Sequence, residues 1–221
     1  MSLSLLSDLD VFEAALTDGI LKERSEEIVE GKLEESGAGL LAALAEKVAA
    51  CSRCALGSTR NKAVFGQGPL SPLVLVVGEG PGAEEDRQGL PFVGASGQLL
   101  DKMLASIGLS RETNTYIANI VKCRPPQNRE PAPDERAACL GYLREQIKIL
   151  SPKIILCAGR TAAQTLLDTN EGINKLRGRT FDFEGIPLIA SFHPSALLRD
   201  ESLKRPAWED LKRLRSAIQG F

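Results

Sequence analysis

The sequence predicts an α/β fold in which a mostly parallel sheet is covered by helices on both faces. Two observations support this class. Short, continuous apolar runs, which are typical of strands buried on both faces, recur from residue 73 onward. A segment of helical length and pattern follows each of them. Ligands of such folds bind at the carboxyl ends of the strands, so we expect function in the loops after residues 78, 121, 159 and 191.

The first half of the predicted sheet contains two strands, each followed by a helix. LVLVVG, residues 73–78, is the first strand and ends in a glycine. SGQLLDKMLASIG, residues 96–108, is an amphipathic helix that its last glycine stops. TYIANIV, residues 115–121, is the second strand, and a longer helix is expected over 132–150.

The second half repeats this alternation with shorter elements. KIILCAG, residues 153–159, is the third strand, and RTAAQTLLD, residues 160–168, is a short helix. Residues 179–193 have the pattern of a hairpin whose second arm is a central strand. Residues 206–218 form the closing helix. We find no internal repeat.

The 221 residues fit one domain with an appendage, and we expect an acidic helical arm at 1–44 and a functional domain at 45–221. Residues 1–48 carry 4 Lys or Arg against 11 Asp or Glu, a net charge of -7. The remaining residues carry 23 basic and 18 acidic side chains, a net charge of +5. The overall charge of -2 therefore conceals a basic body that is compatible with a DNA partner, although a solvated acidic helix explains the arm equally well.

Several classes of protein are not expected from this sequence. No apolar run approaches the roughly 18 residues of a membrane span. The first residues, MSLSLLSDLDVFEAAL, lack the basic region of a secretory signal and contain acidic residues early. We therefore expect a cytoplasmic protein without a membrane partner.

The cysteines have a pattern that favours metal binding. Structural disulfides are rare in a reducing compartment, so binding of a metal or simple burial must explain the five thiols. Cys51 and Cys54 have C-x2-C spacing, and Cys123 and Cys139 are separated by fifteen residues. Structural zinc usually uses two close pairs, so this spacing favours an iron-sulfur cluster, with zinc as the alternative. Cys157 lies in an apolar strand and is expected to be an inert buried thiol.

The loop after the first strand, GEGPGAEEDRQGLPFVGASG at 78–97, is the first candidate site. Gly78, Gly80 and Gly82 allow a ligand to approach the backbone closely, although a plain tight turn explains them as well. The spacing does not match the dinucleotide-binding fingerprint. Phe92 either packs on the protein or stacks on a planar ligand.

Two polar residues follow other predicted strands. Asn119 near the end of the second strand has a donor and an acceptor side by side, as needed to pair with one edge of a base. A structural hydrogen bond is the alternative for this residue. His193, the single histidine, follows the last strand in HPSALLR, where it is either structural or catalytic.

Taken together, GEGPGAEED, PFVGASGQLL, NIVKCRPPQNR and HPSALLR resemble the motifs of the bacterial family 4 uracil-DNA glycosylases. The resemblance covers residues 45–218 with the motifs in the correct order. It implies an α/β/α sandwich with a central four-stranded, mainly parallel sheet, and removal of uracil from DNA. It also implies a bound 4Fe-4S cluster with a structural role, whose ligands match Cys51, Cys54, Cys123 and Cys139.

The resemblance also assigns roles in recognition of the base. A uracil must leave the base stack to be cut, and it is recognised by stacking and by its Watson-Crick edge. Phe92 is expected to stack on the base, and Asn119 to bond O4 and N3-H. Because an apolar pocket rejects the extra methyl group of thymine only weakly, a side chain must block that space, and the family match points to Glu85.

Cleavage of the glycosidic bond leaves negative charge on uracil O2 and positive charge on the sugar. His193 is expected to donate to O2, with help from the backbone amides of the loop from Gly78 to Gly82. A related family carries an aspartate that positions water at the place of Gly80, so Glu79 is our candidate for this role here.

Six residues are expected to contact DNA: Lys122, Arg124, Arg129, Ser195, Leu197 and Arg199. The basic residues between Cys123 and Cys139, with Lys122 beside them, would face the phosphates, which supply most of the affinity. Leu197 is the expected wedge into the duplex, with Leu198 as the second choice and packing in the core as the alternative for both.

The sequence therefore predicts a monomeric, monofunctional uracil-DNA glycosylase of base excision repair. Its partner would be uracil-containing DNA, single- or double-stranded. The alternative is an iron-sulfur module that binds DNA or uracil without releasing the base, in association with a polymerase for instance.

Overall fold

The computed structural model describes residues 36–220 of the chain. The chain divides into two units, residues 1–40 and 41–221, and the second unit contains every element named below. The predicted acidic arm lies outside the described residues up to position 35, so it stays a prediction. In the described part of the chain, no helix is long and apolar enough to cross a membrane.

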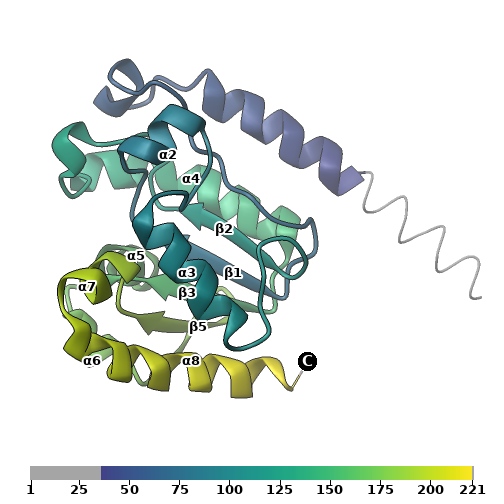
Figure 1. Ribbon diagram of the computed structural model, residues 1–221. Coiled ribbons are helices and arrows are strands. Elements are labelled where there is room, and N and C mark those ends of the chain that lie inside the picture. The colour runs from purple at the N-terminus through teal and green to yellow at the C-terminus, as the bar shows by residue number, and fades with distance from the viewer. Residues whose placement is uncertain (1–35, 221) are drawn as a thin grey trace, which may run out of the picture. The chain divides into compact units, whose positions relative to one another are not determined.

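A five-stranded sheet in the order β2-β1-β3-β5-β4 forms the centre of the second unit (Figure 1). Its strands are β1 (Val74–Gly78), β2 (Thr115–Asn119), β3 (Ile154–Ala158), β4 (Thr180–Phe183) and β5 (Ile186–Ser191). The first four strands in this order are parallel, as the α/β prediction requires, and β4 joins β5 as an antiparallel edge. The sheet thus has one strand more than the four expected.

The extra strand belongs to the hairpin predicted over residues 179–193. Glu184 and Gly185 connect β4 to β5, and both have positive φ, 52° and 86°. A two-residue turn with this conformation matches the twist of the strands that it joins, so β4 pairs with β5 at once. Because β4 lies outside it, β5 is flanked on both sides and its last four residues are buried.

Helices cover both faces of the sheet, and the buried side chains of each strand alternate between them. The α-helices are α2 (Ala83–Gln88), α3 (Ala95–Ala105), α4 (Pro133–Leu150), α5 (Arg160–Leu167), α6 (Ile173–Leu176), α7 (Pro194–Arg199) and α8 (Lys204–Ile218). The 3-10 helices are Ala55–Ser58, Pro126–Asn128 and Glu201–Leu203. The helical residues 41–49, α4 and α5 share one apolar core with the sheet, whereas α3 and α8 share the other. The result is the expected three-layer α/β/α arrangement.

The topology fixes where a ligand can bind. Strand β1 pairs with β2 on one side and with β3 on the other. The order in which successive strands are added to the sheet therefore reverses at β1. The carboxyl ends of the four parallel strands lie at one edge, and the chain leaves them at Gly78, Asn119, Ala158 and Ser191. A crevice at this edge beside such a reversal is the usual ligand site of open α/β sheets.

Candidate active site

An open cavity of about 560 Å³ lies at the carboxyl ends of the parallel strands. It brings together side chains from loops after all four strands. Ten residues singled out from the sequence line it: Glu79, Gly80, Gly82, Glu85, Phe92, Asn119, Arg129, His193, Ser195 and Arg199. The cavity therefore contains both proposed catalytic residues and the polar groups proposed to recognise the base.

Phe92 enters the cavity from a strained loop. Its φ is 52°, a left-handed conformation that is uncommon for an aromatic residue and that surrounding contacts must hold. Arg111 supplies two of these contacts, since its Nη1 donates to Pro91 O and its Nη2 donates to Phe92 O, each at 2.9 Å. The ring of Phe92 lies 5.5 Å from that of His193, centroid to centroid, at an angle of 31°. The aromatic face is thus fixed beside the histidine.

Asn119 ends β2 with its side chain buried at the cavity wall, 2% exposed. Its Oδ1 is a buried side-chain oxygen without a hydrogen-bond partner in the described residues. Such a group costs free energy unless a ligand or water satisfies it. A Cβ at Gly78 would overlap Asn119 Oδ1 and the ring of Phe92, so glycine is required there for the two side chains to converge. Gly78 thus shapes the site although its own atoms do not line the cavity.

Glu85 lies in α2 and lines the cavity, but its carboxylate is already engaged. Oε1 accepts from the backbone N-H groups of Val93 and Gly94 at 3.0 Å, and Oε2 accepts from Gly82 N at 3.2 Å. These bonds join both ends of the loop that carries Phe92. Holding this loop is a function of Glu85 that the sequence did not indicate.

His193 is the N-cap of α7, and the cap determines its tautomer. Nδ1 accepts a hydrogen bond from Ser195 N at 3.1 Å, and the Ser195 hydroxyl lies 2.8 Å from the same nitrogen. In the neutral ring the proton therefore resides on Nε2. The pKa of His193 is lowered to about 4, chiefly by burial and then by the nearby Arg199, while Glu85 opposes the shift. The site thus presents a neutral imidazole N-H donor.

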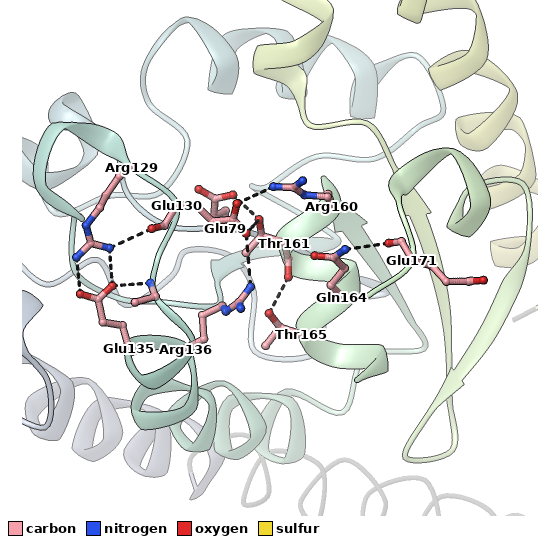
Figure 2. Close-up of polar contacts among 11 residues, drawn as sticks. Glu79, Arg129, Glu130, Glu135, Arg136, Arg160, Thr161, Gln164, Thr165 and Glu171 are labelled. Carbon is pink, nitrogen blue, oxygen red and sulfur yellow. Dashed lines mark hydrogen bonds and ion pairs between the residues drawn. The ribbon is translucent and has the colours of Figure 1, made fainter. Parts of the chain in front are cut away.

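Glu79 also lines the cavity, and it belongs to a network of polar and charged side chains (Figure 2). Its Oε2 accepts from Thr161 Oγ1 at 2.6 Å, and the same hydroxyl lies 3.2 Å from Glu130 Oε1. Arg160 Nη2 bonds Glu130 Oε2 at 2.6 Å, and Arg136 lies 3.5 Å from Glu130 Oε1. The pKa of Glu79 is raised, chiefly by burial and then by Glu130, while Thr161 and the two arginines oppose the shift.

The rim of the cavity carries positive charge. Arg129, Arg160 and Arg199 line it, and each is exposed to solvent. Arg129 also makes a two-point ion pair with Glu135, at 2.6 and 2.8 Å, which fixes its direction. Arg124 does not line the cavity and bonds Asn128 at 2.8 Å.

The predicted cysteine ligands share a second, small pocket. Cys51, Cys54, Cys123 and Cys139 line it, whereas Cys157 is fully buried in β3. Arg60 Nη1 donates to Cys123 Sγ at 3.0 Å, and Lys122 N donates to Cys139 Sγ at 3.3 Å. Within residues 36–220, no group of three His, Cys, Asp or Glu side chains has the spacing to hold a metal ion.

Comparison with known proteins agrees with this geometry. A family model described as the uracil DNA glycosylase superfamily matches residues 65–212. The chain belongs to this superfamily. A type-4 uracil-DNA glycosylase of Thermotoga maritima is 44% identical over 184 residues, which cover 81% of this chain and 95% of that protein. Those of Archaeoglobus fulgidus and Sulfurisphaera tokodaii are 38% and 40% identical, over 77% of this chain and 89% and 81% of their own lengths.

Two predicted DNA contacts do not hold in this member of the uracil-DNA glycosylase superfamily. Lys122 is 1% exposed, and its Nζ donates to Asn119 O at 3.0 Å and to Gln146 Oε1 at 2.5 Å. Burial lowers the pKa of its ammonium to about 8. Leu197 is 2% exposed and packs with Phe192 and Ala207, whereas Leu198 is 50% exposed. Neither Lys122 nor Leu197 reaches the surface, so both predictions are wrong.

Sequence analysis missed four residues of this superfamily site: Arg111, Glu130, Thr161 and Arg160. Thr161 and Arg160 follow β3 directly, so the rule that strand ends carry function could have found them. Arg111 lies before β2 and Glu130 before α4, and neither residue directly follows the carboxyl end of a strand. No local pattern distinguishes them from ordinary surface charges.

Proposed function

We propose that this protein is a monofunctional uracil-DNA glycosylase. It hydrolyses the N-glycosidic bond of a flipped-out deoxyuridine to give free uracil and an abasic site, the first step of base excision repair. One observation carries the proposal: an aromatic ring, an unpartnered buried amide oxygen and a neutral imidazole donor meet in one cavity, at Phe92, Asn119 and His193.

Recognition of uracil follows from the chemistry of these groups. The ring of Phe92 stacks on the flipped base. Asn119 Oδ1 accepts from N3-H, and its amide N-H donates to O4. Cytosine has the opposite donor and acceptor pattern on this edge, so the amide rejects it. Glu85 lies at the cavity wall as the candidate that excludes the methyl group of thymine.

Bond cleavage requires charge stabilisation at both ends of the breaking bond. His193 donates from Nε2 to uracil O2, where negative charge develops, and the amides of the loop from Gly78 to Gly82 assist. Glu79 holds the attacking water in the cavity, which Gly80 also lines. A neutral imidazole serves as the donor because its N-H is retained at physiological pH.

DNA binding is assigned to the positive rim and the segment beside it. Arg129 and Arg199, together with Arg124 and Ser195, bind the phosphates on either side of the flipped nucleotide. Leu198, which is exposed on α7, replaces Leu197 as the wedge that fills the place of the base. The partner is uracil-containing DNA, single- or double-stranded, and we propose a monomer that acts in the cytoplasm.

We assign the second pocket to a 4Fe-4S cluster held by Cys51, Cys54, Cys123 and Cys139. In a 4Fe-4S cluster each of the four thiolates binds a different iron, so the sulfur atoms lie farther apart than the ligands of a single metal ion. The four cysteines line one common pocket, which fits this wider arrangement. The N-H groups that point at Cys123 and Cys139 match this chemistry, since hydrogen bonds to sulfur stabilise thiolate ligands. The cluster would link the segment that precedes the sheet to the loop between β2 and α4.

The experiment is release of uracil from a U:G oligonucleotide by protein purified without oxygen, with T:G and C:G duplexes as controls. We expect free uracil alone, an abasic strand, and about four irons per chain. Cys54→Ser should lower the iron content, whereas Cys157→Ala, which removes the remaining cysteine, should not. Protein with full iron content that binds the duplex and releases no base would instead identify a binding module.

A further inference from the structure

The carboxylate of Glu130 approaches the active site from outside the motifs that define it. It comes from the loop that precedes α4, and its side chain is 41% exposed. Arg160 at the start of α5 and Arg136 in α4 hold it from two directions, with N···O distances of 2.6 and 3.5 Å. A surface carboxylate tied to two arginines from different helices has a fixed direction, and this one points toward Glu79 (Figure 2).

Thr161 is the link between the two carboxylates. Its side chain is buried, 2% exposed, and its hydroxyl lies 2.6 Å from Glu79 Oε2 and 3.2 Å from Glu130 Oε1. A hydroxyl has one proton to donate and lone pairs that accept. The Thr161 hydroxyl can donate its proton to one of the two carboxylates. It can then accept a hydrogen bond from the other carboxyl group only if that second group is protonated. The protonation states of the two carboxyl groups are coupled through this hydroxyl.

The geometry of Glu79 leaves one oxygen for chemistry. Oε2 is bonded to Thr161, whereas Oε1 accepts no side-chain or backbone hydrogen bond from residues 36–220. Glu79 itself lines the cavity, and its backbone O accepts from Val121 N at 3.1 Å. Main chain and side chain are both fixed, so the free oxygen has a defined direction.

We propose that Thr161 and Glu130 are positioning residues for the hydrolytic step, in which they hold Glu79 Oε1 toward the attacking water. This inference rests on the proposed function. In the step, the water oxygen bonds to C1′ of the sugar, and the electron pair of the C1′-N1 bond leaves with uracil. The water proton passes to Glu79, and uracil N1 later takes a proton from solvent. Both residues act through Glu79, which alone of the three is assigned contact with the water.

The charges around Glu79 predict how its pKa responds when a neighbouring residue is replaced. Glu130 raises the pKa of Glu79, whereas the hydrogen bond from Thr161 and the charges of Arg160 and Arg136 lower it. A base must be ionised to accept a proton, so the activity falls as the pH drops through this pKa. Removal of the Glu130 charge should therefore move the acid limb of the activity profile to lower pH, and removal of the Thr161 hydroxyl should move it to higher pH.

The test compares Glu130→Gln, Thr161→Val and Thr161→Ser with wild type in single-turnover uracil release from pH 4 to 9. Thr161→Val should lower the cleavage rate by about 10- to 100-fold with DNA affinity nearly unchanged, and Thr161→Ser should restore most of it. Glu130→Gln should shift the acid limb downward. Glu184→Gln is the matched control, because Glu184 is similarly exposed and paired with Arg144, and it should change nothing.

A second measurement separates this inference from the proposed function. Carbon-13 NMR of labelled glutamate, with Glu79→Gln to assign the signal, gives the pKa of Glu79 without any turnover. The inference requires this pKa to fall in Glu130→Gln and to rise in Thr161→Val. An unchanged Glu79 titration in both variants, or equal losses in Thr161→Val and Thr161→Ser, overturns it. Absence of uracil release by wild type rejects the proposed function instead, whatever the titration shows.

Discussion

The two sides of the cavity differ in how they hold their functional groups. On the base side, formed by Phe92, Asn119 and His193, each group is uncharged and is fixed by backbone contacts or burial. On the water side, Glu79 and Thr161 line the cavity and Glu130 lies behind them, and each carboxylate is held by other side chains, several of them charged. Both sides are anchored to the ends of the same parallel strands.

The difference matches two tasks, recognition of the base and activation of water. A neutral base is recognised by hydrogen bonds whose value depends on exclusion of water, and the one carboxylate proposed to face the base, that of Glu85, is already taken up by backbone N-H groups. The water side must take up a proton and face a positive sugar, which requires a negative group. Burial is the main cause of both pKa shifts, since it disfavours the charged form and so lowers the pKa of His193 and raises that of Glu79. The predictions below test this division.

The largest expected effect comes from His193→Ala. Loss of one donor to a developing oxyanion lowers turnover by about 10²- to 10³-fold, and we expect this loss in the single-turnover rate with duplex binding little changed. Because the pKa of His193 is about 4, the neutral form persists above that pH. The histidine should therefore cause no change in rate between pH 5.5 and 8. A rate that falls as the pH rises through about 6.5, and only in the protein that retains His193, would show that a charged imidazole is needed. It would contradict the description of the base side as uncharged.

The next effect concerns selection on the base side. Asn119→Asp keeps the shape of the side chain but replaces its N-H donor by a charged acceptor next to uracil O4. A buried group without a partner costs about 1–3 kcal/mol, and more when it is charged, so kcat/KM on uracil should fall by about 10- to 100-fold. Discrimination against cytosine should fall with it. Full uracil selectivity in this variant would show that another group recognises the edge of the base.

These predictions concern residues that the sequence placed near one another, and the reason is topological. Gly78 and Asn119 end apolar strands and His193 follows one, and parallel strands end at one edge of the sheet, so local pattern was sufficient to bring them together. The alternation of strands and helices likewise predicted the layers and the parallel core. The β4 edge was visible as part of a hairpin but was not counted as a fifth strand of the sheet.

The failures share a different cause. Lys122 is basic and lies beside a polar loop, but its side chain is buried and donates to the nearby Asn119 O and to Gln146 Oε1 in α4, 24 residues away. Leu197 and Leu198 are equivalent in sequence, and only the packing of α7 on Phe192 and Ala207 separates them. Arg111 and Glu130 act through contacts made by folding. Partners distant in sequence leave no local pattern, so such roles appear only in three dimensions.

The smallest predicted effect tests how the base side is held. Arg111 is 10% exposed and bonds two carbonyl groups of the Phe92 loop, and it also pairs with the exposed Asp101 at 2.8 Å. Arg111→Met should lower the free energy of unfolding by about 1–3 kcal/mol and raise KM for uracil DNA several-fold, because the strained Phe92 loses its support. Asp101→Asn removes the exposed ion pair alone and should cost less than about 1 kcal/mol with KM unchanged. Thermal unfolding and steady-state kinetics measure both variants.

If the two variants lose equal stability with no change in KM, the salt bridge between Arg111 and Asp101 stabilises the fold. Phe92 is then held by other contacts, such as those of Glu85 to the neighbouring amides.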